Sequence, residues 1–259
     1  MERLPVLTQT IGAWDPEPLG YHRVVLHVDE ATGMARAKIP WRRRDREPEK
    51  QQLVVVSEQT GATVGNVVRI DINREFGDIA FEPIDGAGAY WVYFMPYTGT
   101  TKSAYPKTGP EAPTDSTDPA WLDRSDVDAA PAARVVEIQS SGEHDAFTEM
   151  EWIATREETE GVLARHPDAQ FIVFPEDRTR PIRMTTDLPA RWTSEGFDGA
   201  FKGEALRGEH YVFQLGLWAA RGTARDVEIE FGDLISEGGT IRAGSFRCVN
   251  SGGTGWDGQ

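Results

Sequence analysis

Short apolar runs that alternate with polar side chains constrain this chain more than any other feature of its sequence. In 22–28 and 66–72, apolar residues at every second position alternate largely with polar or charged ones, and in 226–231 the alternation is strict. A period of two is typical of a β-strand with one buried face. Turn residues separate the runs at intervals of roughly 8–12 residues, as in β-sandwiches. We therefore predict an all-β fold of two β-sandwich-like lobes with mainly antiparallel strands.

One segment carries convincing helix signals. Thr155 and Glu158 form the pattern of a capping box, Arg165 lies near the expected helix end, and Pro167 follows it. These residues predict one short helix over 155–166, with helix under about a tenth of the chain. Further strands are expected at 34–39, 53–56, 79–81, 90–95, 134–139, 171–174, 181–184, 209–218 and 240–250.

Composition divides the chain into three parts. Residues 98–133 are rich in proline, glycine and aspartate, and they separate two strand-rich blocks. We predict a first β-sandwich lobe at 1–97, an ordered connection at 98–133, and a second β-sandwich lobe with the helix at 134–259. Tyr105 and Trp121 are expected to anchor the connection on the surface, because a free linker has no need of large aromatic side chains.

The charge of the chain excludes several classes of partner. The 42 acidic residues exceed the 27 Lys and Arg, which gives a formal net charge of −15. Such a charge repels phosphate backbones and anionic lipids, so we expect neither nucleic acid nor membrane as a partner. A neutral polymer, such as a glycan, is the class of partner that this negative charge repels least.

The N-terminus bears on the cellular compartment. It lacks the apolar core of a signal peptide, and no apolar window reaches the roughly 18 residues that span a membrane. We therefore expect a cytoplasmic protein, or a secreted one whose signal peptide has been removed.

Metal-binding and nucleophile motifs are missing from the sequence. The five histidines show no metal-site spacing, and the single cysteine, Cys248, has no CxxC partner. Cys248 falls in the strand predicted at 240–250, where we expect a buried, unreactive thiol. The acidic loop at 123–128 offers oxygen ligands for calcium but lacks the glycine and final glutamate of an EF-hand. We expect no metal and no cofactor, with structural calcium in this loop as the alternative.

Carboxylates and aromatic rings supply the remaining chemistry, which suits a glycan. The candidate carbohydrate contacts are Glu176, Asp177, Arg178, Trp41, Trp192 and Trp256. The three polar residues follow the strand predicted at 171–174 and can hydrogen-bond sugar hydroxyls, or they form a local ion pair that closes a turn. The three tryptophans lie beside turns, where an indole can stack on a pyranose or pack in a core. No motif identifies a catalytic acid and base.

A basic run stands out in this acidic chain. Arg42, Arg43 and Arg44 follow Trp41, and no second basic cluster extends them into a track for a polyanion. Guanidinium groups match carboxylates bidentately. We therefore predict that at least one of these arginines pairs between the lobes with an acidic residue from 134–250, and that Trp41 packs in the same seam.

Longer phrases of the sequence resemble one known family. The phrases are Tyr21-His22-Arg23, Pro40-Trp41-Arg42-Arg43-Arg44-Asp45, Phe81-Glu82-Pro83, Tyr90–Tyr97, Met150-Glu151, Phe174-Pro175-Glu176-Asp177-Arg178, Asp233-Leu234, and Phe246-Arg247-Cys248-Val249-Asn250 with Gly253 and Trp256-Asp257-Gly258. Together they span most of residues 20–258. They look like the N-terminal β-sandwich region of bacterial proteins similar to glycoside hydrolase family 123.

The resemblance implies a region without a catalytic centre of its own. In such proteins an adjacent Asp-Glu pair supports substrate-assisted hydrolysis of an acetamido sugar, and it lies in a (β/α) barrel that follows the sandwich region. Glu176-Asp177 has the reverse order and a different place in the chain. We therefore expect a non-catalytic region that supports a following catalytic domain and can contact glycan, and whether this chain is itself an enzyme stays open. The alternatives are a complete glycoside hydrolase with carboxylates between the lobes and a stand-alone sugar-binding module.

Overall fold

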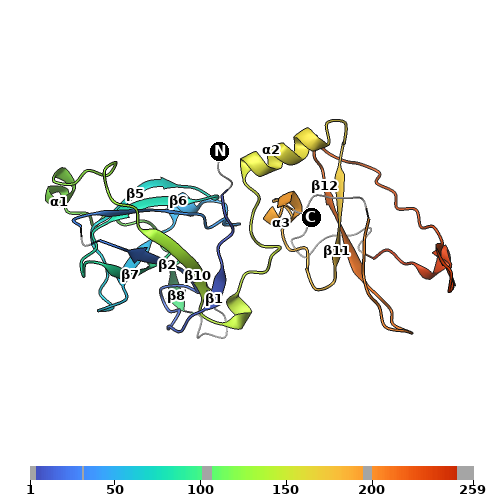
Figure 1. Ribbon diagram of the computed structural model, residues 1–259, viewed down its shortest axis with the longest axis horizontal. Coiled ribbons are helices and arrows are strands. Elements are labelled where there is room, and N and C mark those ends of the chain that lie inside the picture. The colour runs from blue at the N-terminus through green and yellow to red at the C-terminus, as the bar shows by residue number, and fades with distance from the viewer. Residues whose placement is uncertain (1–3, 31, 101–106, 195–199, 250–259) are drawn as a thin grey trace.

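A β-sandwich forms the N-terminal part of the computed structural model, which describes residues 4–30, 32–100, 107–194 and 200–249 (Figure 1). One sheet has the strand order β1-β10-β2-β7-β4 and the other the order β3-β6-β5. The first sheet contains β1 (Gln9–Ile11), β2 (His22–Val28), β4 (Val54–Ser57), β7 (Gly88–Tyr93) and β10 (Arg134–Ser140). The second contains β3 (Ala35–Ile39), β5 (Val67–Ile72) and β6 (Gly77–Phe81). Neighbouring strands are antiparallel except β1 and β10, which run parallel.

The main apolar core lies between these two sheets. In β2, Val24, Leu26 and Val28 are buried, whereas His27 between them lies on the outer face. Ile79 and Phe81 of β6 supply the opposing layer. The alternation predicted for 22–28 is therefore confirmed, and so is the all-β fold class.

Strand β10 belongs to the first sheet of the sandwich, although the predicted domain boundary at residue 134 assigns it to the second lobe. It lies between β1 and β2, with Gln139 opposite Arg23 in the antiparallel register. A boundary at residue 134 would separate this strand from the sheet to which it belongs. We therefore call residues 4–141 the sandwich and residues 142–249 the C-terminal part.

The described part of the connection between β7 and β10 packs on the sandwich. It contains β8 (Tyr97–Thr100), β9 (Lys107–Pro110) and the short helix α1 (Pro119–Asp123). Trp121 of α1 is buried and donates its indole N–H to the carbonyl of Gly33 at 3.0 Å. Trp121 thus holds the connection against the sandwich, while Tyr105, its expected companion, lies outside the described residues.

The C-terminal part contains the helix that the capping box predicts. Helix α2 (Arg156–Arg165) begins after Thr155, whose side chain accepts from the amide of Glu158 while the Glu158 carboxylate accepts from the amide of Thr155. The other elements are α3 (Ala190–Ser194), the antiparallel pair β11 (Ile172–Asp177) and β12 (Phe213–Trp218), the hairpin of β13 (Leu234–Ser236) and β14 (Gly239–Ile241), and 3-10 turns at Pro48–Lys50, Glu143–Asp145 and Ala243–Ser245. No helix in the described ranges is long and apolar enough to span a membrane.

Three strands expected from the sequence are missing or reduced. Residues 226–231 and 181–184 form no strand, and of 240–250 only the first residues pair, in β14. Val227 and Ile229 are about 40 % exposed. Alternation tells which side chains would face a core, but a strand also needs a neighbour for its backbone hydrogen bonds, and 226–231 has none in the described chain. Cys248 is accordingly exposed, which corrects the expectation of a buried thiol.

Candidate functional site

Two of the candidate carbohydrate contacts, Glu176 and Trp192, lie against each other. The alternation of β11 points Glu176 to the same side as Ile172 and Phe174, so its side chain is buried facing α3. Its Oε1 accepts a hydrogen bond from the indole N–H of Trp192 at 2.8 Å and another from Nε of Arg191 at 3.1 Å. The carboxylate is therefore held by a charged donor, Arg191, and a neutral donor, Trp192, both from α3.

The ring of Trp192 packs as a core residue does. It stacks on Phe174 with 4.4 Å between centroids and an interplanar angle of 1°. It also lies over Gly216 of β12, where an added Cβ would overlap the ring. One face of the indole is thus covered by Phe174, which favours the packing alternative over stacking on a sugar.

Asp177 and Arg178 form a separate cluster at the end of β11. Asp177 accepts hydrogen bonds from the hydroxyl of Tyr211 and from the amide and hydroxyl of Thr179. These donors, the Tyr211 hydroxyl first among them, lower the pKa of Asp177 to about 2. Arg178 pairs with Glu209 and lies over the Tyr211 ring. Because successive residues of a strand face opposite sides, Glu176 and Asp177 do not converge on one site.

Trp41 lies inside the sandwich, so it has no face to offer a glycan. It is 1 % exposed, and its indole N–H donates to the carbonyl of Asn73 at 2.8 Å. Gly77 of β6 leaves the space that its ring fills, and Phe94 packs against it. Trp256, the third candidate tryptophan, lies outside the described residues.

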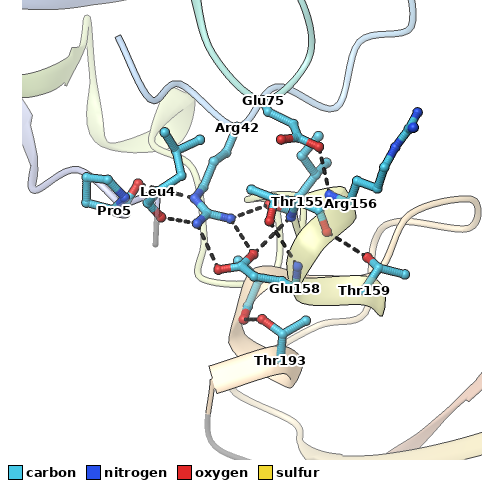
Figure 2. Close-up of polar contacts among 11 residues, drawn as sticks. Leu4, Pro5, Arg42, Glu75, Thr155, Arg156, Glu158, Thr159 and Thr193 are labelled. Atoms are coloured by element: carbon cyan, nitrogen blue, oxygen red, sulfur yellow. Dashed lines mark hydrogen bonds and ion pairs between the residues drawn. The ribbon is translucent and has the colours of Figure 1, made fainter. Parts of the chain in front are cut away.

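Arg42 is the centre of the contact between the sandwich and the C-terminal part (Figure 2). Its side chain is fully buried and forms a bidentate pair with Glu158 of α2, at 2.8 Å from Nη1 to Oε2 and 3.0 Å from Nη2 to Oε1. The guanidinium also donates to the carbonyls of Ile153, Pro5 and Leu4. Each of its nitrogens therefore has an acceptor, which offsets the cost of burying the charge.

The neighbouring arginines behave differently from Arg42. Arg43 pairs with Asp45 inside the sandwich, and its burial lowers the pKa of its guanidinium. Arg44 is half-exposed and reaches Glu151 of the C-terminal part at 3.0 Å. Arg42 and Arg44 thus contact acidic residues from 134–250, and Arg43 does not.

A second bidentate pair crosses the same seam. Arg74 donates to Asp187 through Nη1 at 2.9 Å and Nη2 at 2.7 Å. Arg74 lies in the turn between β5 and β6, outside the basic run, and nothing in the sequence around it distinguishes it from an exposed turn residue. Trp152 and Ala190 complete the seam by packing on the core of the sandwich.

The acidic loop at 123–128 engages the protein itself. Asp126 accepts hydrogen bonds from the amides of Asp128 and Ala129, and Asp128 lies 3.3 Å from Arg36. Within the described ranges, no group of three or more His, Cys, Asp or Glu has a metal-binding arrangement. Calcium binding in this loop stays a prediction.

Comparison with known proteins locates the sandwich in a family. The model of the glycoside hydrolase 123 N-terminal domain matches residues 12–141, which end one residue after β10. No curated protein and no solved structure shows a significant match to the chain. The match covers half of the chain and contains every strand of the two packed sheets except β1. The chain belongs to the glycoside hydrolase 123 N-terminal domain family.

Proposed function

We propose that this chain is the non-catalytic β-sandwich region of a glycoside hydrolase and that it supports the catalytic domain. Its partners are that domain and a neutral glycan, with neither nucleic acid nor membrane among them. We place it in the cytoplasm, or outside the cell after removal of a signal peptide. The family match supports the assignment to this class of enzyme.

The carboxylates support a structural role for the chain. Glycoside hydrolysis needs a general acid whose pKa is raised, whereas the pKa of Asp177 is lowered to about 2. Glu151 and Glu158, the carboxylates between the two parts, are each paired with an arginine and almost fully buried. These ion pairs disfavour the alternative of a complete hydrolase with its carboxylates between the lobes.

The observation that carries the supporting role is a set of exposed apolar residues in the C-terminal part. Its members are Val212, Leu215, Leu217, Val227, Ile229, Phe231, Leu234, Ile235 and Ile241. Ile235, in the hairpin of β13 and β14, is 80 % exposed. These segments lie on the side away from the sandwich, at the right of Figure 1. Exposed apolar side chains gathered in one part of a molecule indicate an interaction site, and we assign this one to the catalytic domain.

Amide hydrogen exchange tests this role. The chain is compared with the same chain extended through the reading frame that follows Gln259. Exchange at 212–217 and 227–241 should slow by about tenfold or more in the longer protein, because a docked domain protects these segments. Ile235→Glu should restore fast exchange. Ile70→Glu, at an exposed position on β5 of the sandwich, should leave the protection unchanged.

Two results would overturn the supporting role. One is a stop codon directly after Gln259 in the gene. The other is exchange in the longer protein as fast as in the chain alone.

A further inference from the structure

A groove of about 600 Å³ lies between the N-terminal segment of the sandwich and helix α3. The extended chain 4–7 forms one wall, Phe147 and Trp152 contribute aromatic surface, and Glu149 and Arg191 supply the polar end. Its volume falls within the range of about 300–1,000 Å³ that is typical of sites for small molecules.

The walls of the groove are fixed by partly buried hydrogen bonds. Arg42 donates to the carbonyls of Leu4 and Pro5, which ties the first wall to the seam (Figure 2). Gln9 bonds the backbone of Phe147 in both directions, from Nε2 to the carbonyl at 3.0 Å and from the amide to Oε1 at 2.9 Å. The groove therefore exists before any ligand arrives, which lowers the entropy cost of binding.

The polar end presents a carboxylate between two guanidinium groups. Oε2 of Glu149 lies 3.3 Å from Nη1 of Arg191 and 3.0 Å from Nε of Arg180, and the Glu149 side chain is 62 % exposed. Arg191 is oriented in turn by buried Glu176, 3.1 Å from its Nε. Hydrogen-bond acceptors and charged donors thus lie side by side within reach of a ligand.

Apolar surface adjoins this polar end. One face of the Phe147 ring stacks on His22, with 4.0 Å between centroids, and the ring meets Trp152 edge-on at 4.9 Å. The part of Phe147 that stays exposed lines the groove beside Leu7. A ligand that fills the groove must offer hydroxyl groups at one end and C–H surface at the other. A pyranose has both, because its equatorial hydroxyls surround apolar ring faces.

We propose that this groove binds the end of a neutral saccharide, with Glu149 and Arg191 hydrogen-bonding its hydroxyls and Phe147 contacting its C–H face. A net charge of −15 opposes anionic ligands, and the two arginines oppose cationic ones. The inference rests on the proposed function only in its assignment to glycoside hydrolases. It does not require that a catalytic domain docks on the C-terminal part.

Saturation-transfer NMR on the full chain tests the site with lactose, cellobiose, maltose and N,N′-diacetylchitobiose as probes. At least one should bind, and titration then measures its affinity. Glu149→Gln should weaken binding by about tenfold or more, because hydrogen bonds to a charged group are lost. Val6→Trp, at an exposed position of the wall, should abolish binding by filling the groove.

Glu160→Gln, a matched change at an exposed position of α2, should leave the affinity unchanged. Urea unfolding of each variant shows that a loss of binding is not a loss of fold. The proposal is overturned if none of the four probes binds, if binding survives both groove variants, or if a sulfated disaccharide binds more tightly than the neutral ones. Each of these results leaves the hydrogen-exchange test of the supporting role intact, so the two proposals can fail separately.

Discussion

Both carboxylate oxygens of Glu158 accept hydrogen bonds from the buried guanidinium of Arg42, and the same carboxylate caps the first turn of α2. The cap and the ion pair between the two parts of the molecule therefore share one side chain. Helix α2 cannot keep its capping box in the observed form if Glu158 swings toward solvent. The position of this helix is thus coupled to the sandwich through a buried charge pair, beside the hydrogen bond from the amide of Arg156 to Glu75 at 2.7 Å.

Removal of Arg42 should destabilise the protein strongly. Arg42→Ala leaves the Glu158 carboxylate buried without its cation, which should cost about 3–5 kcal/mol in the free energy of unfolding. Arg44→Ala, at a half-exposed pair, should cost less than about 1 kcal/mol. Urea midpoints at an unchanged m-value measure both effects. If the two substitutions prove equally mild, the pair does not hold the seam together.

Gly77→Ala should destabilise the sandwich, because the new Cβ would overlap the buried ring of Trp41. Overpacking of this kind costs about 1–3 kcal/mol. Gly65→Ala is the matched control, since nothing lies within 4 Å of the Cβ that it adds. Thermal unfolding compares the two variants. A Gly77→Ala protein as stable as the control would show that Trp41 can move aside at little cost.

His22 should make the protein less stable as the pH falls below about 6.5. Burial lowers the pKa of His22 below its ordinary value of 6.5, despite the opposing effects of Asp145 and Glu151. Well above pH 6.5 the imidazole is neutral in both the folded and the unfolded state, so its titration does not change the free energy of unfolding there. As the pH falls toward the folded-state pKa, the unfolded chain takes up a proton that the folded chain does not, so stability is lost.

Urea unfolding between pH 7.5 and 5 measures this dependence. His22→Asn should flatten the slope of unfolding free energy against pH in that window. Ile138→Val, which weakens the same core without a titrating group, should lower stability and keep the slope. An unchanged slope in His22→Asn would assign the pH dependence to other groups.

The isolated chain should hydrolyse no aryl glycoside above background. Asp177 is held ionised by Tyr211 and Thr179, and Glu176 points to the opposite side of β11, so they cannot act as an acid and a base on one bond. A spectrophotometric assay with 4-nitrophenyl glycosides measures turnover. Activity that Glu176→Gln or Asp177→Asn removes would support a complete hydrolase instead.

Local signals predicted the elements that depend on local forces. The capping box of Thr155 and Glu158 defines where α2 begins, because its hydrogen bonds lie within one turn. The alternation of 22–28 predicted β2 correctly, yet the stricter alternation of 226–231 predicted a strand that is not there. The two segments differ in whether another strand can pair with them. Strand β2 lies between β10 and β7, whereas 226–231 has no paired strand in the described chain.

Long-range placement could not be derived from the sequence. The composition of 98–133 suggested a boundary, but β10 returns to the first sheet because its Ile138 fits the core there. In the same way, Arg42 could be singled out because it lies in a basic run. Arg74 forms an equally well-oriented pair, but its turn has no sequence feature that predicts it. The cluster of Glu176, Arg191 and Trp192 depends on how α3 packs on β11, which no spacing reveals.

The place of β10 also sets the order in which the protein can fold on the ribosome. Arg23 of β2 and Gln139 of β10 are neighbours in the sheet but lie 116 positions apart in the chain. Until β10 has left the exit tunnel, β1 has no partner and one edge of β2 stays open. Pairing of such distant segments is slow because a long loop must close first. The nascent chain therefore carries an unprotected sheet edge while the residues between β2 and β10 are synthesised. A chaperone that binds open sheet edges would act in this interval.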